Sequence, residues 1–129
     1  MTLISVTRLR VRSIRFLPVF LWYSFKSNQQ AKQAQGNLAS TVRAAGNNVF
    51  WTSTVWENEA DMRSFMRSGS HREAMPKLQN WCDEGSVVHW QSESRTLPSW
   101  KEAETAMFTQ GRFTPLTYPS IAHQNHRFQ

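Results

Sequence analysis

His71 is the first residue in this sequence whose type and position indicate chemistry. Ser70 and Glu73 form an N-terminal capping box, which predicts a helix with His71 in its first turn. Met75 and Leu78 follow at i+4 and i+7, so His71 belongs to the apolar face of that helix. Burial and the helix dipole both disfavour an imidazolium there. A neutral ring of this kind serves as a general base or an axial haem ligand. The alternative is a packed histidine that bonds the backbone.

Four further residues are candidate ligand contacts. Trp56 ends the most regularly alternating segment, and Arg72 follows His71, so the two could offer an aromatic wall and a cation to a planar or acidic ligand. His89 and Trp90 are neighbours in a later alternating segment and therefore face opposite sides of a strand. The alternative for each is an ordinary core or surface role.

The sequence lacks the residue spacings that protein-ligated metal sites and nucleotide-binding sites require. Cys82 is the single cysteine, and neither His71 nor His89 has a third ligand at helical or hairpin spacing, so we expect no protein-ligated metal site. Haem needs only one axial side chain and stays open, as does chemistry without a cofactor. The sequence has no Ser-His-Asp motif, phosphate-binding glycine loop or dinucleotide fingerprint.

The positive charge of the chain suggests nucleic-acid binding as a second class of function. Its 129 residues include 15 Lys and Arg against 9 Asp and Glu, a net charge of +6. Arg8, Arg10 and Arg12 would share one face of a strand and form a cationic rail for nucleic acid. No nucleic-acid-binding motif accompanies them, so this is the weakest of the alternatives, and a solvated face is the simpler interpretation.

The N-terminal region imitates a secretory signal, because an apolar run at residues 16–23 follows basic residues. Pro18 interrupts the run, which is far shorter than the ~20 residues that span a bilayer. We therefore expect this region to belong to the fold, and the protein to be cytoplasmic, unprocessed and without a membrane span.

The elements that must position these residues follow from periodicity and capping. Period-2 alternation predicts four strands, at residues 2–11, 38–44, 48–56 and 86–94. Pro18 and Gly36 bracket one helix, and capping patterns predict others after Asn58, Ser70 and Ser99. This order predicts an α+β, ferredoxin-like split β-α-β fold, with a four-stranded antiparallel sheet and helices on one face. The domain would cover residues 1–111, followed by an irregular tail at 112–129.

Apolar residues on both faces of the predicted strands bear on assembly. Leu3 and Ile4, like Phe50 and Trp51, are neighbours that must point to opposite faces. A large apolar surface on the sheet face without helices would be unfavourable in water, so we expect two copies of the chain to pair through that face. A monomer with a ligand against the sheet is the competing interpretation.

One block of the sequence resembles a known group of proteins. It consists of Trp51–Trp56, Met62–Met66, Ser68–Met75, and then Trp81 and Glu84. These residues resemble the central segment of spheroidene-monooxygenase-like proteins, in the dimeric α/β-barrel group that includes antibiotic-biosynthesis and haem-degrading monooxygenases. The resemblance implies a homodimer with a ligand cavity between sheet and helices, and oxygenation that is haem-dependent or cofactor-free.

Taken together, these patterns predict a monooxygenase-like protein that binds a planar or apolar small molecule. If the protein is an enzyme, His71 would be its base or haem ligand, Trp56 and Trp90 its pocket walls, and Arg72 its anion contact. The alternative is a non-catalytic ligand-binding or structural dimer.

Overall fold

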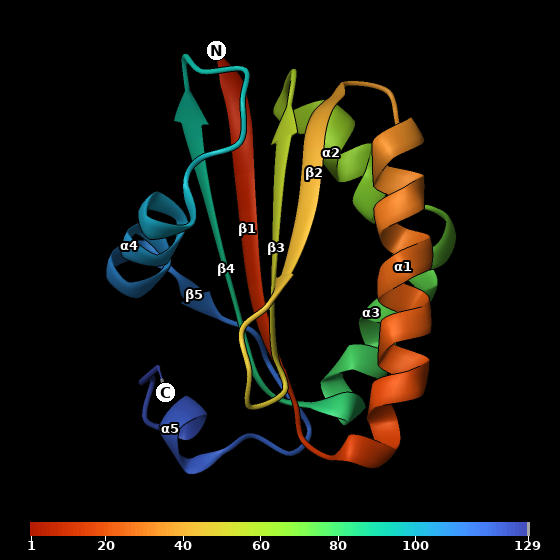
Figure 1. The fold of residues 1–129 in the computed structure, drawn as a ribbon, viewed down its shortest axis with the longest axis vertical. Coiled ribbons are helices and arrows are strands. Elements are labelled where there is room, and N and C mark those ends of the chain that lie inside the picture. Colours follow the sequence, from red (N-terminus) through yellow and green to blue (C-terminus); the bar gives the residue numbers. More distant parts are fainter. Residues whose placement is uncertain (129) are drawn as a thin grey trace.

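A single antiparallel sheet organises the chain, and the strand that begins the sequence lies near its centre (Figure 1). The computed structural model describes residues 1–128, except the side chains of Ser70 and His71. The sheet order is β2-β3-β1-β4-β5, which confirms the ferredoxin-like arrangement and adds one short edge strand to the four expected. The strands are β1 (Thr2–Val11), β2 (Asn37–Ala44), β3 (Val49–Trp56), β4 (Cys82–Ser92) and β5 (Arg112–Phe113).

Three helices cover one face of the sheet (Figure 1). They are α1 (Leu17–Gln33), α2 (Glu59–Met66) and α3 (Gly69–Trp81), with the short 3-10 helix η1 (Ile14–Phe16) before α1. Phe20 of α1 is fully buried and its ring lies 5.1 Å from that of Phe50. The apolar run at 16–23 thus belongs to η1 and α1, as expected, and no described helix is long and apolar enough to cross a membrane.

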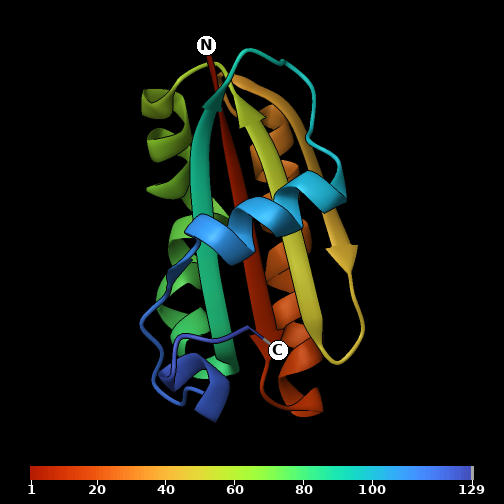
Figure 2. The same ribbon diagram turned by 90° about the vertical axis from the view of Figure 1, so that its left-hand side faces the viewer.

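The opposite face is covered by α4 (Trp100–Gln110), which crosses the strands obliquely (Figure 2). Ala103 and Met107 of α4 are fully buried against a cluster that includes Ile4, Val6 and Trp51. The expectation that all helices lie on one face is therefore corrected. The apolar side chains that suggested a second copy are the surface on which α4 of the same chain packs.

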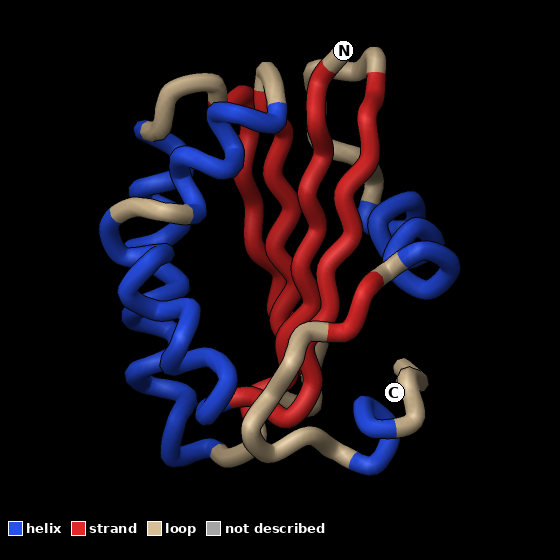
Figure 3. Tube along the Cα trace, turned by 180° about the vertical axis from the view of Figure 1, so that it is seen from behind, coloured by secondary structure: helices blue, strands red, loops and turns tan. Residues whose placement is uncertain are grey.

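The segment after α4 was expected to be irregular but carries two short elements. β5 pairs with β4, and α5 (Ile121–Gln124) lies against the end of the sheet (Figure 3). The ring of His123 is buried and accepts a hydrogen bond from the Gly85 amide at Nδ1, while Nε2 lies 2.8 Å from the Thr114 carbonyl oxygen. We call residues 112–128 the C-terminal strap.

Two element boundaries differ from the sequence prediction. α3 begins at Gly69 after Ser68, two residues before the predicted start. β4 begins at Cys82 rather than at Ser86, because α3 passes directly into the strand without a loop. Gly85 therefore lies inside β4, where a Cβ would come within 3.2 Å of Leu9 Cδ2.

Candidate functional site

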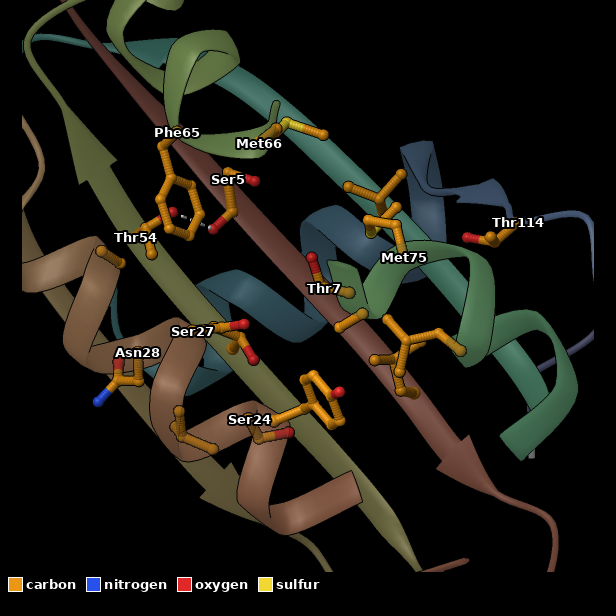
Figure 4. Close-up of a pocket in the computed structure, with 18 of the residues that line it drawn as sticks. Ser5, Thr7, Ser24, Ser27, Asn28, Thr54, Phe65, Met66, Met75 and Thr114 are labelled. Atoms are coloured by element: carbon orange, nitrogen blue, oxygen red, sulfur yellow. Dashed lines mark hydrogen bonds between the residues drawn. The ribbon is translucent and has the colours of Figure 1, made fainter. Parts of the chain in front are cut away.

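A cavity of about 330 Å³ lies between the sheet and helices α1, α2 and α3 (Figure 4). We call it the sheet–helix cavity. Its floor consists of side chains from the face of the sheet that α4 does not cover, and its roof consists of side chains from the three helices. This is where the sequence analysis expected a ligand to bind. The volume falls within the range of about 300–1,000 Å³ that is typical of small-molecule sites.

The floor is polar because four strands place short polar side chains side by side. Ser5 of β1 pairs with Thr54 of β3 and with His89 of β4, and Ser40 of β2 pairs with Thr54. Cross-strand partners point to the same face of a sheet, so these four residues form a row across the cavity floor. Part of the row is satisfied within the protein, since Ser40 donates to Asn28 Oδ1 at 2.7 Å.

A second polar row lies one pleat further along. Thr7 of β1 pairs with Thr52 of β3, and both line the cavity. Ser24 and Ser27 of α1 reach into the cavity from the roof (Figure 4). Within the described part of the chain, none of these four hydroxyl groups has a hydrogen-bond partner, so all four are available to a ligand or to water.

The end of the cavity nearest α2 is apolar and aromatic. Trp56 is fully buried and donates from Nε1 to Thr54 Oγ1 at 2.8 Å. Its ring lies 5.2 Å from the ring of Phe65, and Met62 and Met66 extend the same surface. A flat apolar group can pack against these side chains while its polar atoms face the floor.

His89 is a titratable group on the floor of the cavity, at the β4 end of the first polar row. Its side chain is half-buried, and Nε2 is enclosed without a hydrogen-bond partner among the described residues. Burial lowers the pKa of His89, and the charge of Arg112 lowers this pKa further, against the opposing charge of Glu59. The imidazole is therefore neutral at pH 7, and one of its nitrogens can accept a proton or a hydrogen bond from a ligand.

The structure brings together only part of the predicted site. Trp56 and His89 line the cavity. Trp90 packs on the opposite face with the α4 cluster, and Arg72 is exposed and outside the cavity lining, so neither contributes to this site. The side chain of His71 lies outside the described residues, and its role stays a prediction.

Sequence reasoning missed Arg112, which lines the cavity from β5. It lies in the segment expected to be irregular, where alternation over two residues gives no signal. The polar part of the floor could have been found, because Ser5 and Thr7 share one face of a predicted strand, and Thr52 and Thr54 share one face of another.

No metal site is formed by the described residues, in which no three His, Cys, Asp or Glu side chains cluster. His89 offers an imidazole to haem, but the cavity lies at the small end of the range for drug-sized ligands. A cavity of this volume is too small to enclose a whole haem macrocycle, so haem binding stays a prediction and carries no part of the proposal below.

The predicted cationic rail is not a free surface. Arg8 is 4% exposed and donates to Glu84 Oε1 at 2.9 Å beneath the C-terminal strap. Arg10 pairs with Asp83, and Arg12 donates to the carbonyl oxygen of Asn80 at 2.6 Å. These contacts remove the residue basis for the nucleic-acid alternative.

The chain matches one protein-family model. The family model described as "Domain of unknown function (DUF3291)" matches residues 20–110. A comparison with curated proteins finds no match.

Solved structures share the fold at low sequence identity. A crystal structure of an antibiotic biosynthesis monooxygenase superposes with a TM-score of 0.63 at 13% identity, covering 71% of this chain and 99% of that chain. SnoaB, a cofactor-independent oxygenase from Streptomyces nogalater, gives a TM-score of 0.60 at 14% identity, covering 76% and 98%. A conserved protein from Methanosarcina mazei Go1 gives a TM-score of 0.64 at 14% identity, covering 72% and 94%. These neighbours confirm the predicted likeness to antibiotic-biosynthesis-monooxygenase-like proteins; such identities show the fold alone.

Proposed function

The chain belongs to the DUF3291 family, and from the geometry of its cavity we propose that it binds a planar or apolar small molecule between the sheet and helices α1, α2 and α3. The carrying observation is the contrast between the two sides of the cavity. Short polar side chains from four strands lie on the floor beside apolar ones such as Leu9, Val42 and Val87, and aromatic and thioether side chains form much of the roof. An apolar body with one or two polar atoms matches this division.

His89 supports a catalytic version of this proposal. A neutral imidazole on the floor can remove a proton from an acidic C–H of the ligand, and the resulting carbanion can react directly with O₂. For anthrone, a planar three-ring ketone, the balanced reaction is anthrone plus O₂ giving anthraquinone plus water. The fold shared with a cofactor-independent oxygenase supports the same chemistry by analogy.

Anthrone is therefore the probe for both parts of the proposal. We expect it to quench tryptophan fluorescence through Trp56 on binding, and we expect protein-dependent O₂ uptake in an oxygen-electrode assay. His89→Gln is expected to lower the uptake by about 10²-fold or more, the usual contribution of a general base. His126→Asn is the control, because His126 is exposed and stacks on Phe113 of the strap.

The outcomes separate three interpretations. Binding with His89-dependent uptake supports the oxygenase. Binding without uptake supports the non-catalytic ligand-binding alternative. Uptake that survives His89→Gln but falls with His71→Gln would assign the base to His71, as the sequence analysis expected. Absence of binding to anthrone and to other planar aromatic probes would refute the proposal.

The homodimer stays a prediction, and the surface that supports it is now on helix α1 rather than on the sheet. Helix α4 packs on the outer face of the sheet, so the apolar residues of that face no longer require a second copy. Exposed apolar side chains remain on α1, where Trp22 and Phe25 are 58% and 59% exposed. We propose that any second copy packs against α1, and light scattering of wild-type protein beside Trp22→Gln tests this.

A further inference from the structure

The position of Arg112 narrows the chemistry of the ligand. β5 pairs with β4 so that Arg112 lies opposite Val87. Val87 in turn pairs with Thr7, and Thr7 with Thr52, so Arg112 continues the second polar row to the edge of the sheet. Its neighbour Phe113 pairs with Ser86 and faces the other side, where its ring contacts His123. The register of two residues thus directs a guanidinium to the cavity.

Arg112 is the one charged side chain among the described residues that line the cavity. The described part of the lining contains no Asp, Glu or Lys. No described carboxylate forms an ion pair with Arg112, whereas Arg8, Arg10 and Arg43 each have at least one such partner. Arg112 is exposed, which places it where the cavity opens to solvent.

Building on the proposed function, we propose that the ligand is a planar or apolar carboxylic acid whose carboxylate binds Arg112 at the mouth of the sheet–helix cavity. Its rings then extend inward over Thr7 and Thr52 towards the aromatic end at Trp56. Arginine suits this role because its planar fork donates two parallel hydrogen bonds to a carboxylate. The absence of acidic side chains from the described lining means that nothing there repels the anion.

The position of Arg112 also links the charge of the ligand to the pKa of His89. The guanidinium of Arg112 is near enough to lower the pKa of His89. A carboxylate bound to Arg112 offsets that charge, so the pKa of His89 is expected to be higher with the acid bound than with a neutral isostere bound.

A matched pair of probes tests the proposal. 2-Naphthoate and 2-naphthamide have the same rings and shape and differ in charge. In calorimetric titrations of the wild-type protein we expect the acid to bind about tenfold more tightly, as for one charge-assisted contact near the surface. This preference should weaken between about 50 and 500 mM salt. Arg112→Gln should abolish it, and Arg67→Gln, at an exposed arginine outside the lining, should retain it.

Each result has a defined meaning. Preference for the acid that is lost only in Arg112→Gln supports the anion site. Equal binding of both probes overturns the anion site and leaves the proposed function standing. Failure of both probes to bind contradicts the proposed function and this inference with it. NMR titration of His89 gives an independent readout, because a pKa that rises equally with both probes would exclude the charge coupling.

Discussion

Replacing Arg8 with methionine should destabilise the protein far more than the loss of a surface arginine. Arg8 and Glu84 form an ion pair in which the side chains are 4% and 2% exposed. Arg8→Met would leave the Glu84 carboxylate buried without that partner, and breaking such a pair usually costs about 3–5 kcal/mol. Among the described residues, Glu84 keeps contacts with the Ser120 hydroxyl at 3.1 Å and with Arg10 at 3.5 Å. We therefore expect a loss at the lower end, about 3 kcal/mol.

Urea unfolding measures this loss directly. With a slope of about 2 kcal/mol per molar urea, the midpoint should fall by about 1.5 M. Arg63→Met is the control, since Arg63 and Glu59 are 57% and 59% exposed and solvent screens their ion pair, so its loss should change stability little. Adding Glu84→Gln to Arg8→Met removes the stranded charge and should recover stability. The reasoning is refuted if Arg8→Met costs no more than Arg63→Met, or if the double variant is less stable than Arg8→Met alone.

Other groups give shorter predictions. Burial raises the pKa of the Cys82 thiol to about 12, so a disulfide reagent at about pH 8 should react with it only after unfolding; rapid labelling of the native protein would contradict the packing. Gly85→Ala places a Cβ 3.2 Å from Leu9 Cδ2 and 3.3 Å from Thr114 Cβ, and this crowding should cost about 1–3 kcal/mol in thermal unfolding, whereas an unchanged Tm would show that the strap does not pack there. The pKa of His89 is lowered from 6.5 by burial and by Arg112, so its contribution to stability is present above about pH 6.5 and lost as the pH falls towards the lowered value. His89→Gln should flatten that part of the stability–pH curve, and a curve that superposes on the wild-type one would argue against the shift.

Local chemistry accounts for the elements that the sequence predicted well. Ser99 caps α4 by accepting a hydrogen bond from the Glu102 amide, as its capping box indicated. The same rule misplaced the start of α3, because Ser68 precedes a glycine that takes φ +57 as the first helical residue. A capping box describes one favourable pair of residues, and it does not exclude an earlier start.

Periodicity and capping rules could not predict where the elements pack relative to one another. Periodicity shows that α4 has an apolar face, but it does not show which face of the sheet that helix covers. The apolar outer face was therefore attributed to a second copy, although Ala103 and Met107 of the same chain occupy it. Likewise, Trp56 and His89 were identified as site residues from their strands, whereas Arg112 reaches the site only through the pairing of β5 with β4.

The C-terminal strap has a consequence for divergence among related proteins. The match to the family model ends at residue 110, whereas Arg112, Thr114 and Leu116, which help to enclose the cavity, lie beyond it. Changes confined to these strap residues would therefore alter which ligand the cavity prefers and leave the matched part of the fold intact. We expect chimaeras that swap this terminal segment to transfer ligand choice while leaving the sheet and its three covering helices unchanged.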